Sequence, residues 1–188
     1  MIQQMPDSSL DTLQLETPRL ILRVPALADL DAFAAMMADE ETARFIGGVA
    51  PREMTWRFLM TMIGSWHATG VSMFSVFEKA TGRWVGRLGP WRPDGWPGAE
   101  VGWAIVRDCW GRGYATEGAA AAMDFAFDRL GWTDIIHSIA PENAASQQVA
   151  RKLGSRNRGP GRLPPPLADA VVDLWGQTRE EWRARRRA

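Results

Sequence analysis

The segment from Glu100 to Leu130 constrains the fold most, because it combines three local patterns in a fixed order. Residues 101–106 are rich in β-branched and aromatic side chains, which favours a strand. From residue 115 onward apolar side chains recur at steps of three or four, which predicts a helix. Gly111 and Gly113 lie between the two. A strand that leads through a glycine turn into a helix is a candidate cradle for a phosphate or diphosphate, because amides at a helix start lack partners and attract anions.

Two other glycine motifs are excluded by their spacing. A dinucleotide fingerprint, Gly-x-Gly-x-x-Gly, needs a third glycine where Thr116 stands. Gly113 and Gly118 have the spacing of a P-loop, but alanines follow Gly118, so the lysine and the magnesium-binding hydroxyl are missing. The turn is therefore either a plain tight connection or a phosphate cradle of another type.

Residues 110–117, Trp-Gly-Arg-Gly-Tyr-Ala-Thr-Glu, resemble the acyl-CoA pyrophosphate loop of the GCN5-related N-acetyltransferases (GNAT). The family pattern is Gln/Arg-x-x-Gly-x-Gly/Ala; Trp110 takes its first place, Gly113 the fourth and Ala115 the sixth. Tryptophan in the first place departs from the general pattern. It is similar to the branch that contains the ribosomal-protein N-terminal acetyltransferases, in which Trp-Gly-x-Gly-Tyr-Ala-Thr-Glu is usual.

Three further segments resemble the same branch. Residues 16–20 read Glu-Thr-Pro-Arg-Leu, and residues 174–182 resemble its usual end. Residues 141–154 resemble the second cofactor segment of the family, Asn-x-x-Ser followed by Lys-Leu-Gly, with Asn143 and Ser146 in the named places. The resemblance implies an α/β (α+β) fold of GNAT type, with a mixed central sheet of about seven strands, splayed between the fourth and fifth, and about four flanking helices.

Length and composition favour one domain and exclude several classes of protein. The 188 residues suit a flexible N-terminal tail over residues 1–13 and a single N-acetyltransferase domain over 14–188. The 22 basic and 22 acidic residues balance, which makes a nucleic-acid partner unlikely. The single Cys109 excludes an internal disulfide and a multi-cysteine metal site, and histidine spacing gives no zinc helix, so no metal is expected. The chain start does not resemble a signal peptide, and no apolar run would span a membrane, so we expect a cytoplasmic protein.

Local patterns predict the remaining elements. Strands are expected at 20–24, 72–77, 84–88, 134–140 and 170–175, with a hairpin turn at Thr81-Gly82. Helices are expected from a cap at Asp29 to 38, over 51–66, over 143–153 with a stop at Gly154, and after a Thr178–Glu181 capping box. Residues 89–98 and 159–166 are expected to be loops. The helix over 51–66 is expected to bury one apolar face, formed by Met54, Phe58, Met62 and Ile63.

The resemblance also implies where a cofactor binds. Acetyl-CoA would lie in the gap between the central strand and the next one. Amides from Gly111 to Thr116 would hold its pyrophosphate, and the backbone around Ile105 would pair with the pantetheine arm and polarise the thioester carbonyl. The predicted cofactor-binding residues are Ile105, Val106, Trp110, Gly111, Arg112, Gly113, Tyr114, Ala115, Thr116, Asn143 and Ser146. For Asn143 a plain helix N-cap is an equal alternative.

Two residues are predicted to be catalytic. Glu100, at the start of the central strand, is the candidate general base for the acceptor amine; its alternative is a solvated strand-end charge. Many family members protonate the leaving thiolate with a tyrosine, but Tyr114, the only tyrosine of this chain, lies in the glycine turn. Ser146, a water molecule, or departure of the unprotonated thiolate remain as alternatives. His137 alternates with apolar strand residues, which indicates a core or pocket-wall position.

The predicted function is transfer of acetyl from acetyl-CoA to a primary amine, either a protein N-terminus or a small molecule, by direct attack within a ternary complex. The alternative is an acyl-CoA-binding sensor with little turnover. The loop between Trp91 and Trp96 and the prolines 164–166 are expected to shape the acceptor site. The oligomeric state stays open, with a homodimer as the favoured interpretation.

Overall fold

The computed structural model describes residue 10 and residues 12–187. Most of the tail expected over residues 1–13 therefore lies outside the described residues. Within that segment Leu10 and Leu13 are buried and belong to the main hydrophobic core.

Eight strands form one mixed sheet, which confirms the predicted fold class with one strand more than expected. The strand order is β1-β2-β3-β4-β5-β6-β8-β7, and every neighbouring pair is antiparallel except β5 and β6. The strands are β1 Gln14–Glu16, β2 Leu20–Arg23, β3 Phe74–Glu78, β4 Trp84–Trp91, β5 Glu100–Ile105, β6 Asp134–Ile139, β7 Arg156–Gly161 and β8 Val172–Thr178.

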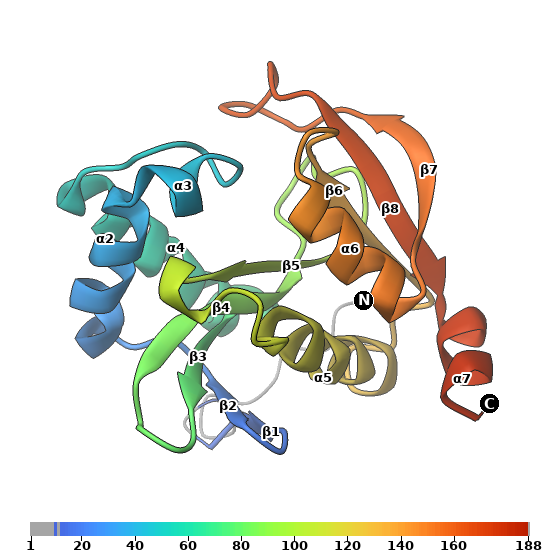
Figure 1. The fold of residues 1–188 in the computed structure, drawn as a ribbon, viewed down its shortest axis with the longest axis horizontal. Coiled ribbons are helices and arrows are strands. Elements are labelled where there is room, and N and C mark those ends of the chain that lie inside the picture. The colour runs from blue at the N-terminus through green and yellow to red at the C-terminus, as the bar shows by residue number, and fades with distance from the viewer. Residues whose placement is uncertain (1–9, 11, 188) are drawn as a thin grey trace.

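The sheet splits between β5 and β6. The two parallel strands share one register pair, Glu100 with Ile136, and the Ile136 N–H donates to the Ala99 carbonyl at 2.9 Å. Beyond this pair the strands diverge, as Figure 1 shows. Since β5 and β6 correspond to the fourth and fifth strands predicted from the sequence, the split lies where the resemblance placed it.

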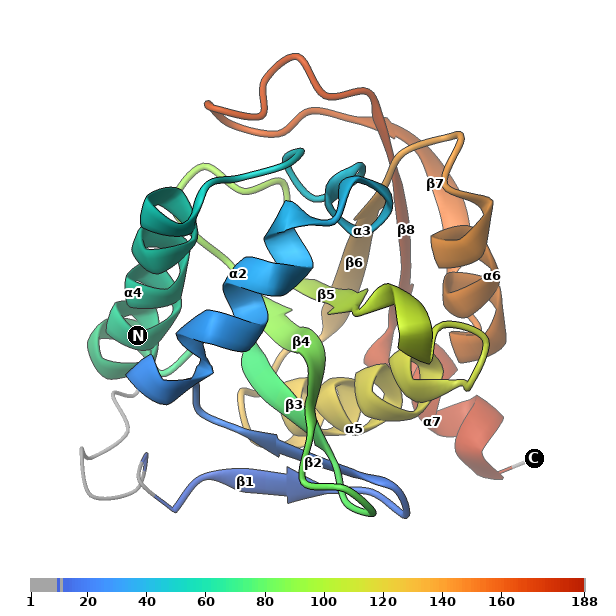
Figure 2. The same ribbon diagram turned by 60° about the vertical axis from the view of Figure 1, so that its left-hand side comes forward.

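Helices cover both faces of the sheet. The described residues form six α-helices: α2 Leu30–Ala38, α3 Glu40–Ala43, α4 Arg52–Thr69, α5 Tyr114–Asp128, α6 Ala144–Leu153 and α7 Arg179–Arg187. Short 3-10 helices precede α2 and follow β5, at Leu27–Asp29 and Arg107–Cys109. Helices α2 and α4 lie on one side of strands β3–β5 and α5 lies on the other (Figure 2). The sheet therefore offers two chemically separate faces beside the split.

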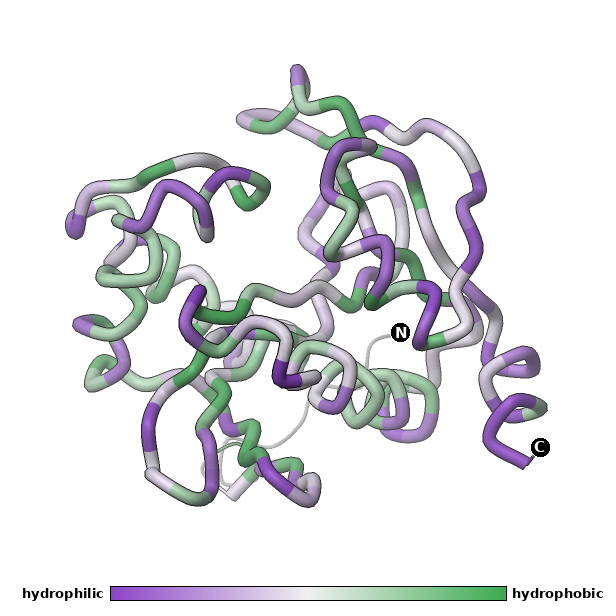
Figure 3. Tube along the Cα trace, in the orientation of Figure 1, coloured by the Kyte–Doolittle hydropathy of each residue, from purple (hydrophilic) through white to green (hydrophobic). Residues whose placement is uncertain are grey.

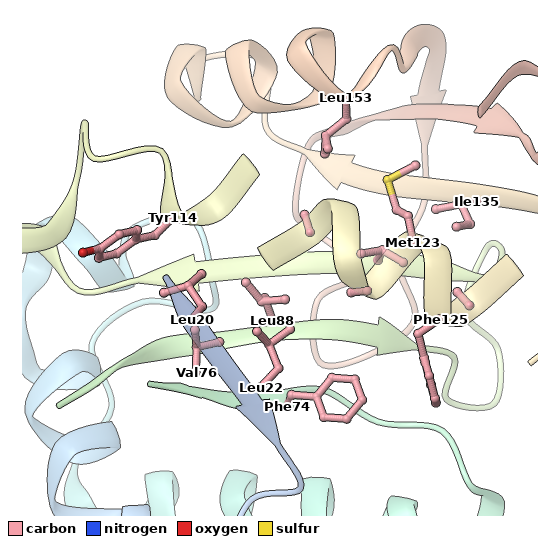
Figure 4. Packing of buried hydrophobic residues seen from close by; sticks show 14 of the residues in the cluster. Leu20, Leu22, Phe74, Val76, Leu88, Tyr114, Met123, Phe125, Ile135 and Leu153 are labelled. Atoms are coloured by element: carbon pink, nitrogen blue, oxygen red, sulfur yellow. The ribbon is translucent and has the colours of Figure 1, made fainter. Parts of the chain in front are cut away.

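The larger core lies between the sheet and α5. Figure 4 shows Leu20, Leu22, Phe74 and Leu88 from three strands beneath Met123 of α5. All five side chains are fully buried. This packing holds the start of α5 at a fixed position relative to the end of β5, since both ends belong to the same rigid layer.

The buried face of α4 agrees with the expected one only in part: Met62 is buried and Ile63 is partly buried, as predicted. Met54 and Phe58 are 38% and 41% exposed, whereas the buried side chains lie along a neighbouring stripe: Thr55, Leu59, Met62 and Trp66. The pattern was misleading because that stripe begins with a polar residue. The Thr55 hydroxyl is satisfied by the Pro51 carbonyl at 3.2 Å, so it is buried without an unpaired polar group.

The extents of two predicted loops were wrong. Gly89 to Trp91 extend β4 and pair with β5, so the loop before β5 is shorter than residues 89–98. Residues 156–161 form β7, which pairs only with β8 at the sheet edge. A proline such as Pro160 is tolerated there because an edge strand needs no donor on its outer side. The glycine- and proline-rich composition concealed this strand.

Two predicted caps have different outcomes. Asp29 is the N-cap residue of α2, as predicted, but its carboxylate bonds Arg23, the Ala26 N–H and the Ser75 hydroxyl and makes no capping bond to the amides of α2. The capping box of α7 is confirmed. The Thr178 N–H donates to Glu181 at 2.8 Å, and the Glu181 N–H donates to the Thr178 hydroxyl at 3.2 Å.

The basic end of the chain lies on α7, which is largely hydrophilic (Figure 3). Trp182 is its buried anchor. Arg183 pairs with Asp128 at 2.8 Å, and Arg186 pairs with Asp124 at 3.1 Å, both on α5. These arginines therefore serve a solvated helix–helix contact.

Candidate active site

The glycine turn has the geometry of an anion cradle. Gly111 and Gly113 have φ angles of 74° and 82°, a left-handed conformation that side chains with a Cβ rarely adopt. Gly113 is the N-cap of α5, and its carbonyl accepts the Glu117 N–H at 3.0 Å. This is the first hydrogen bond of the helix, so the amides of residues 114–116 have no intrahelical acceptor. They lie at the positive end of the helix dipole, where an anion is stabilised.

Arg19 and Thr17, in the segment just before β2, fix this turn in place. The Arg19 side chain donates to the Arg112 carbonyl at 2.9 Å and to the Glu117 carboxylate at 2.6 Å. The Thr17 hydroxyl also donates to Glu117, at 2.6 Å. The sequence alone did not predict that Thr17 and Arg19 contact the glycine turn. Residues 16–20 and 110–117 both resembled the same branch, but nothing in the sequence indicated that the two segments contact each other.

Tyr114 anchors the turn from the inside. Its ring is buried, its hydroxyl donates to Glu78 of β3, and the Arg19 guanidinium lies 4.8 Å from the ring centre. The hydrogen bond to Glu78 and burial raise the pKa of Tyr114. The phenol therefore points away from the split, and only the backbone amide of Tyr114 is placed to meet a ligand.

At the end of β5 the backbone offers one donor toward the split. The Val106 N–H donates to Val85 at 3.0 Å and the Val106 carbonyl accepts from Cys109, so both of its backbone groups are engaged within the fold. Antiparallel alternation then turns the N–H and carbonyl of Ile105 away from β4. The Trp110 indole N–H donates a hydrogen bond to the Ile105 carbonyl at 2.7 Å. The Ile105 N–H is left facing the split, and Val106 contributes no backbone donor to it.

His137 lies near the apex of the split and is confirmed as a core residue. Its Nδ1 lies 2.6 Å from the Val101 carbonyl and its Nε2 lies 2.9 Å from the Ser155 hydroxyl. A carbonyl can only accept, so Nδ1 carries the proton. Burial lowers the pKa of His137 to about 4, which keeps the ring neutral. The His137 imidazole thus links β6 to the Val101 carbonyl of β5, where the two strands no longer form backbone hydrogen bonds to each other.

The second cofactor segment borders the same split. Asn143 caps α6 by accepting the Ser146 N–H at 3.0 Å, so its side-chain oxygen already has a structural role. The Ser146 hydroxyl accepts a 3.3 Å hydrogen bond from the Trp103 indole of β5. Ser146 therefore faces β5 across the split, and its own hydroxyl hydrogen is not used in that bond.

Glu100 is not a solvated strand-end charge. Its side chain is 7% exposed, and its carboxylate accepts from the Trp96 indole at 2.6 Å and from the Ser138 hydroxyl at 2.9 Å. Burial raises the pKa of Glu100, although these hydrogen bonds and the positive charge of Arg87 oppose the shift. A buried carboxyl with a raised pKa suits a general base, because its proton affinity lies nearer to neutrality.

The two loops predicted to shape an acceptor site meet beside Glu100. Trp91 and Trp96 stack edge to face with ring centres 6.4 Å apart. Gly95 lies against Pro164, at van der Waals distance from where a Cβ would stand. Trp96 thus bonds the candidate base directly, and Pro164 lies against the loop that carries Trp96.

A cavity of about 470 Å³ opens on the α2 side at the other end of β5. Ion pairs Arg83–Asp108, at 2.6 Å, and Arg107–Asp39, at 3.5 Å, border it. Its complete lining is Ala32, Ala35, Met36, Asp39, Thr42, Arg83, Trp84, Val106, Arg107 and Asp108. It was not foreseen from the sequence because its lining comes from three distant segments.

Other chemistries find little support among the described residues. Cys109 is buried, and burial raises the pKa of its thiol, so it is a poor nucleophile. Within residue 10 and residues 12–187, no three His, Cys, Asp or Glu side chains are grouped to hold a metal ion. None of the helices in that part of the chain is long and apolar enough to cross a membrane.

A mixed sheet that splits beside a helix start with open amides is consistent with the class of acyltransferases. Comparison with known proteins narrows this to a family: the model "Acetyltransferase (GNAT) domain" matches residues 19–156, and the chain belongs to the GNAT acetyltransferases. An uncharacterised N-acetyltransferase, p20, from Bacillus licheniformis is 28% identical over 164 residues, covering 86% of this chain and 92% of the relative.

Solved structures agree in fold. An acetyltransferase from Agrobacterium tumefaciens str. C58 has a TM-score of 0.77 and 28% identity, covering 89% of this chain and 95% of the other. RimJ of Mycobacterium smegmatis, solved in complex with CoA-disulfide, has a TM-score of 0.69 and 20% identity, covering 86% and 83%. The likeness to RimJ shows the shared fold. The expected branch is thus represented among the structural neighbours.

Proposed function

We propose that this enzyme transfers an acetyl group from acetyl-CoA to a primary amine by direct attack within a ternary complex. The observation that carries the proposal is the glycine turn, whose open amides at the start of α5 adjoin the split between β5 and β6. A diphosphate is the group that such amides bind best, and CoA carries one next to its pantetheine arm.

In this proposal the glycine turn and the split each bind a different part of acetyl-CoA. Amides of residues 111–116 hold the diphosphate, and Trp110 keeps the end of β5 in place through its bond to Ile105. The Ile105 N–H faces the split and polarises the thioester carbonyl as an oxyanion donor. Asn143 caps α6 and so places Ser146 opposite β5.

The chemical step needs an uncharged amine. A lysine-like amine has a pKa near 10.4, so it is almost entirely protonated at neutral pH. Glu100 accepts one proton of the ammonium group, directly or through a water, and the amine lone pair then attacks the acetyl carbon while the carbon–sulfur bond breaks. The nitrogen loses its second proton to solvent as the amide forms. The Ser146 hydroxyl hydrogen, which the bond from Trp103 does not use, protonates the departing thiolate, and Ser146 regains a proton from solvent. Orientation of the two substrates supplies most of the acceleration, up to roughly 7–11 kcal/mol in an ideal case.

The test is release of CoA thiol, measured with wild type and with Ser146→Ala over a panel of amines and N-terminal peptides. We expect acceptor-dependent release, with kcat reduced in Ser146→Ala and the KM for acetyl-CoA nearly unchanged. Tight acetyl-CoA binding without release for any acceptor would instead identify an acyl-CoA sensor. Equal kcat in both proteins would remove Ser146 from the mechanism and leave solvent as the acid.

A further inference from the structure

Arg87 of β4 lies on the same face of the sheet as Glu100. It pairs in register with Ala104, and alternation along β5 puts Ala104, Gly102 and Glu100 on one face. The Arg87 guanidinium lies 5.7 Å from the Phe33 ring of α2, which identifies this face as the one covered by α2 and α4. Two opposite charges thus share the face that adjoins the acceptor loops.

The guanidinium of Arg87, a partly buried residue, is poorly satisfied for a cation in this position. Its Nε is buried with no hydrogen-bond partner, and one terminal nitrogen faces the thioether sulfur of Met73 at 2.5 Å, which is a weak acceptor. Desolvation lowers the pKa of Arg87 to about 10, while the charge of Glu100 supports the cation. Arg87 therefore stays positive at neutral pH, although burying an unpaired charge is costly.

Other arginines of the chain contrast with it. Arg19, Arg23, Arg83 and Arg158 each meet a carboxylate at 2.7 Å or less. Among the described residues, the ion pairs within 4.0 Å include neither Arg87 nor Glu100. If Arg87 served only to neutralise Glu100, direct pairing would be the better solution, because it would bring the donors of Arg87 to the acceptors of Glu100.

Gly102 keeps the space between the two charges clear of side chains from β5. A Cβ at this position would lie 2.9 Å from the Met73 methyl carbon and 3.3 Å from a Glu100 oxygen. The absence of a side chain there leaves room for the Glu100 carboxylate and for the end of Met73, the flexible side chain that also contacts Arg87. The arrangement is complementary to a ligand that carries a positive and a negative group a short distance apart.

Building on the proposed function, we propose that Arg87 determines acceptor specificity by binding a carboxylate of the acceptor. The acceptor is then a zwitterionic amine of the amino-acid type, whose ammonium group is directed to Glu100. The planar guanidinium has donors in a fork that matches a carboxylate, including the Nε that lacks a partner. A simple amine would leave this donor unpaired and would bind less well.

The experiment compares amino acids with their carboxamides and with the corresponding decarboxylated amines, scored as kcat/KM for CoA release. Wild type, Arg87→Gln, Arg87→Lys and the surface control Arg183→Gln are assayed together. Circular dichroism and thermal unfolding of each variant confirm that it is folded. In parallel, the shift in Tm on adding each amine in the presence of CoA reports acceptor binding without turnover.

We expect wild type and Arg183→Gln to prefer the carboxylate by at least tenfold over the carboxamide. Arg87→Gln should abolish that preference by weakening the carboxylate substrate alone, and Arg87→Lys should restore part of it. Equal losses on all amines, or a wild-type preference for neutral amines, would overturn the proposal. If CoA release is absent but a carboxylate-dependent Tm shift disappears in Arg87→Gln, the anion site stands and the catalytic proposal fails; absence of both signals refutes both.

Discussion

The Arg19 guanidinium and the Glu117 carboxylate, 98 positions apart in the sequence, meet at 2.6 Å and join β2 to the first turn of α5. Burial works against the charge of Glu117, but hydrogen bonds from Thr17 and Arg19 outweigh it and hold the pKa of this carboxyl below its ordinary value. The same arginine holds the Arg112 carbonyl, so one side chain fixes both ends of the glycine turn. The anion cradle is therefore built by two segments rather than by its own loop alone.

We predict that Glu117→Gln weakens acetyl-CoA binding about tenfold, which corresponds to roughly 1.4 kcal/mol. The amide keeps the shape but loses the charged bonds, so the turn loosens. Isothermal titration with acetyl-CoA measures the effect, with Asp128→Asn, which breaks an exposed ion pair on the same helix, as the control. Because the carboxyl pKa is lowered in the folded chain, its contribution to stability is full above the pKa of the unfolded chain, about 4.3, and is lost as pH falls through the lower folded value. The stability difference from wild type should therefore shrink steadily as pH falls below about 4. A difference that stays constant with pH throughout acid titration would exclude the charged bonds as its cause.

A second prediction concerns a negative charge in the turn. Gly111 and Gly131 have φ angles of 74° and 70°, and an added Cβ meets no atom within 4 Å at either site. Glutamate at either position should therefore cost a similar stability, about 1 kcal/mol for the left-handed backbone. Only Gly111→Glu places an anion beside the amides of the turn. We expect it to raise the KM for acetyl-CoA at least tenfold while Gly131→Glu leaves the KM unchanged; equal KM values in the two variants would contradict the cradle.

The sequence was most informative where one residue type is required by the backbone or by a short-range bond. The glycines of the turn, the stop at Gly154 and the Thr178–Glu181 capping box were predictable because each depends on neighbours within a few positions. The order of strand, turn and helix followed from the same local patterns. The central strands and the split were expected because the family resemblance implied them.

Features that depend on partners distant in sequence could not be predicted. The buried face of α4 is chosen by what α2 and the sheet present to it, not by the apolar period, and Met54 and Phe58 are exposed for that reason. The edge strand β7 exists because β8 offers a free edge, which overrides an unfavourable glycine and proline content. Arg87 could not be singled out in the sequence, because its proposed role depends on its position beside Phe33 and on the nearby charge of Glu100.

Glu100→Gln should lower kcat/KM at least a hundredfold if the carboxylate removes the proton from the acceptor. Because burial raises the pKa of Glu100 above its ordinary value, the acidic limb of the wild-type pH profile should lie above pH 4.5. Glutamine cannot titrate, so the limb should disappear from the residual activity. Rates of wild type and Glu100→Gln, measured from pH 5 to 9 with saturating acetyl-CoA, show whether the limb belongs to Glu100. A variant that keeps the wild-type limb would assign it to another group.

The neutral, buried His137 should make the protein acid-sensitive in a defined range. Its pKa is about 4 in the folded chain, where Nδ1–H donates to Val101, against about 6.5 in an unfolded chain. Between these values the unfolded chain binds more protons than the folded one, so stability is full above pH 6.5 and falls as pH decreases toward 4. The loss is on the order of 3 kcal/mol. Because His137→Gln cannot titrate, its unfolding free energy, measured in urea at successive pH values, should lack that part of the slope. ¹⁵N NMR at pH 7 should find the proton on Nδ1, with Nε2 accepting. If an NMR titration gave His137 a midpoint at or above 6.5, the ring would not stay neutral between the strands, and the account of how it bridges β5 and β6 would fail.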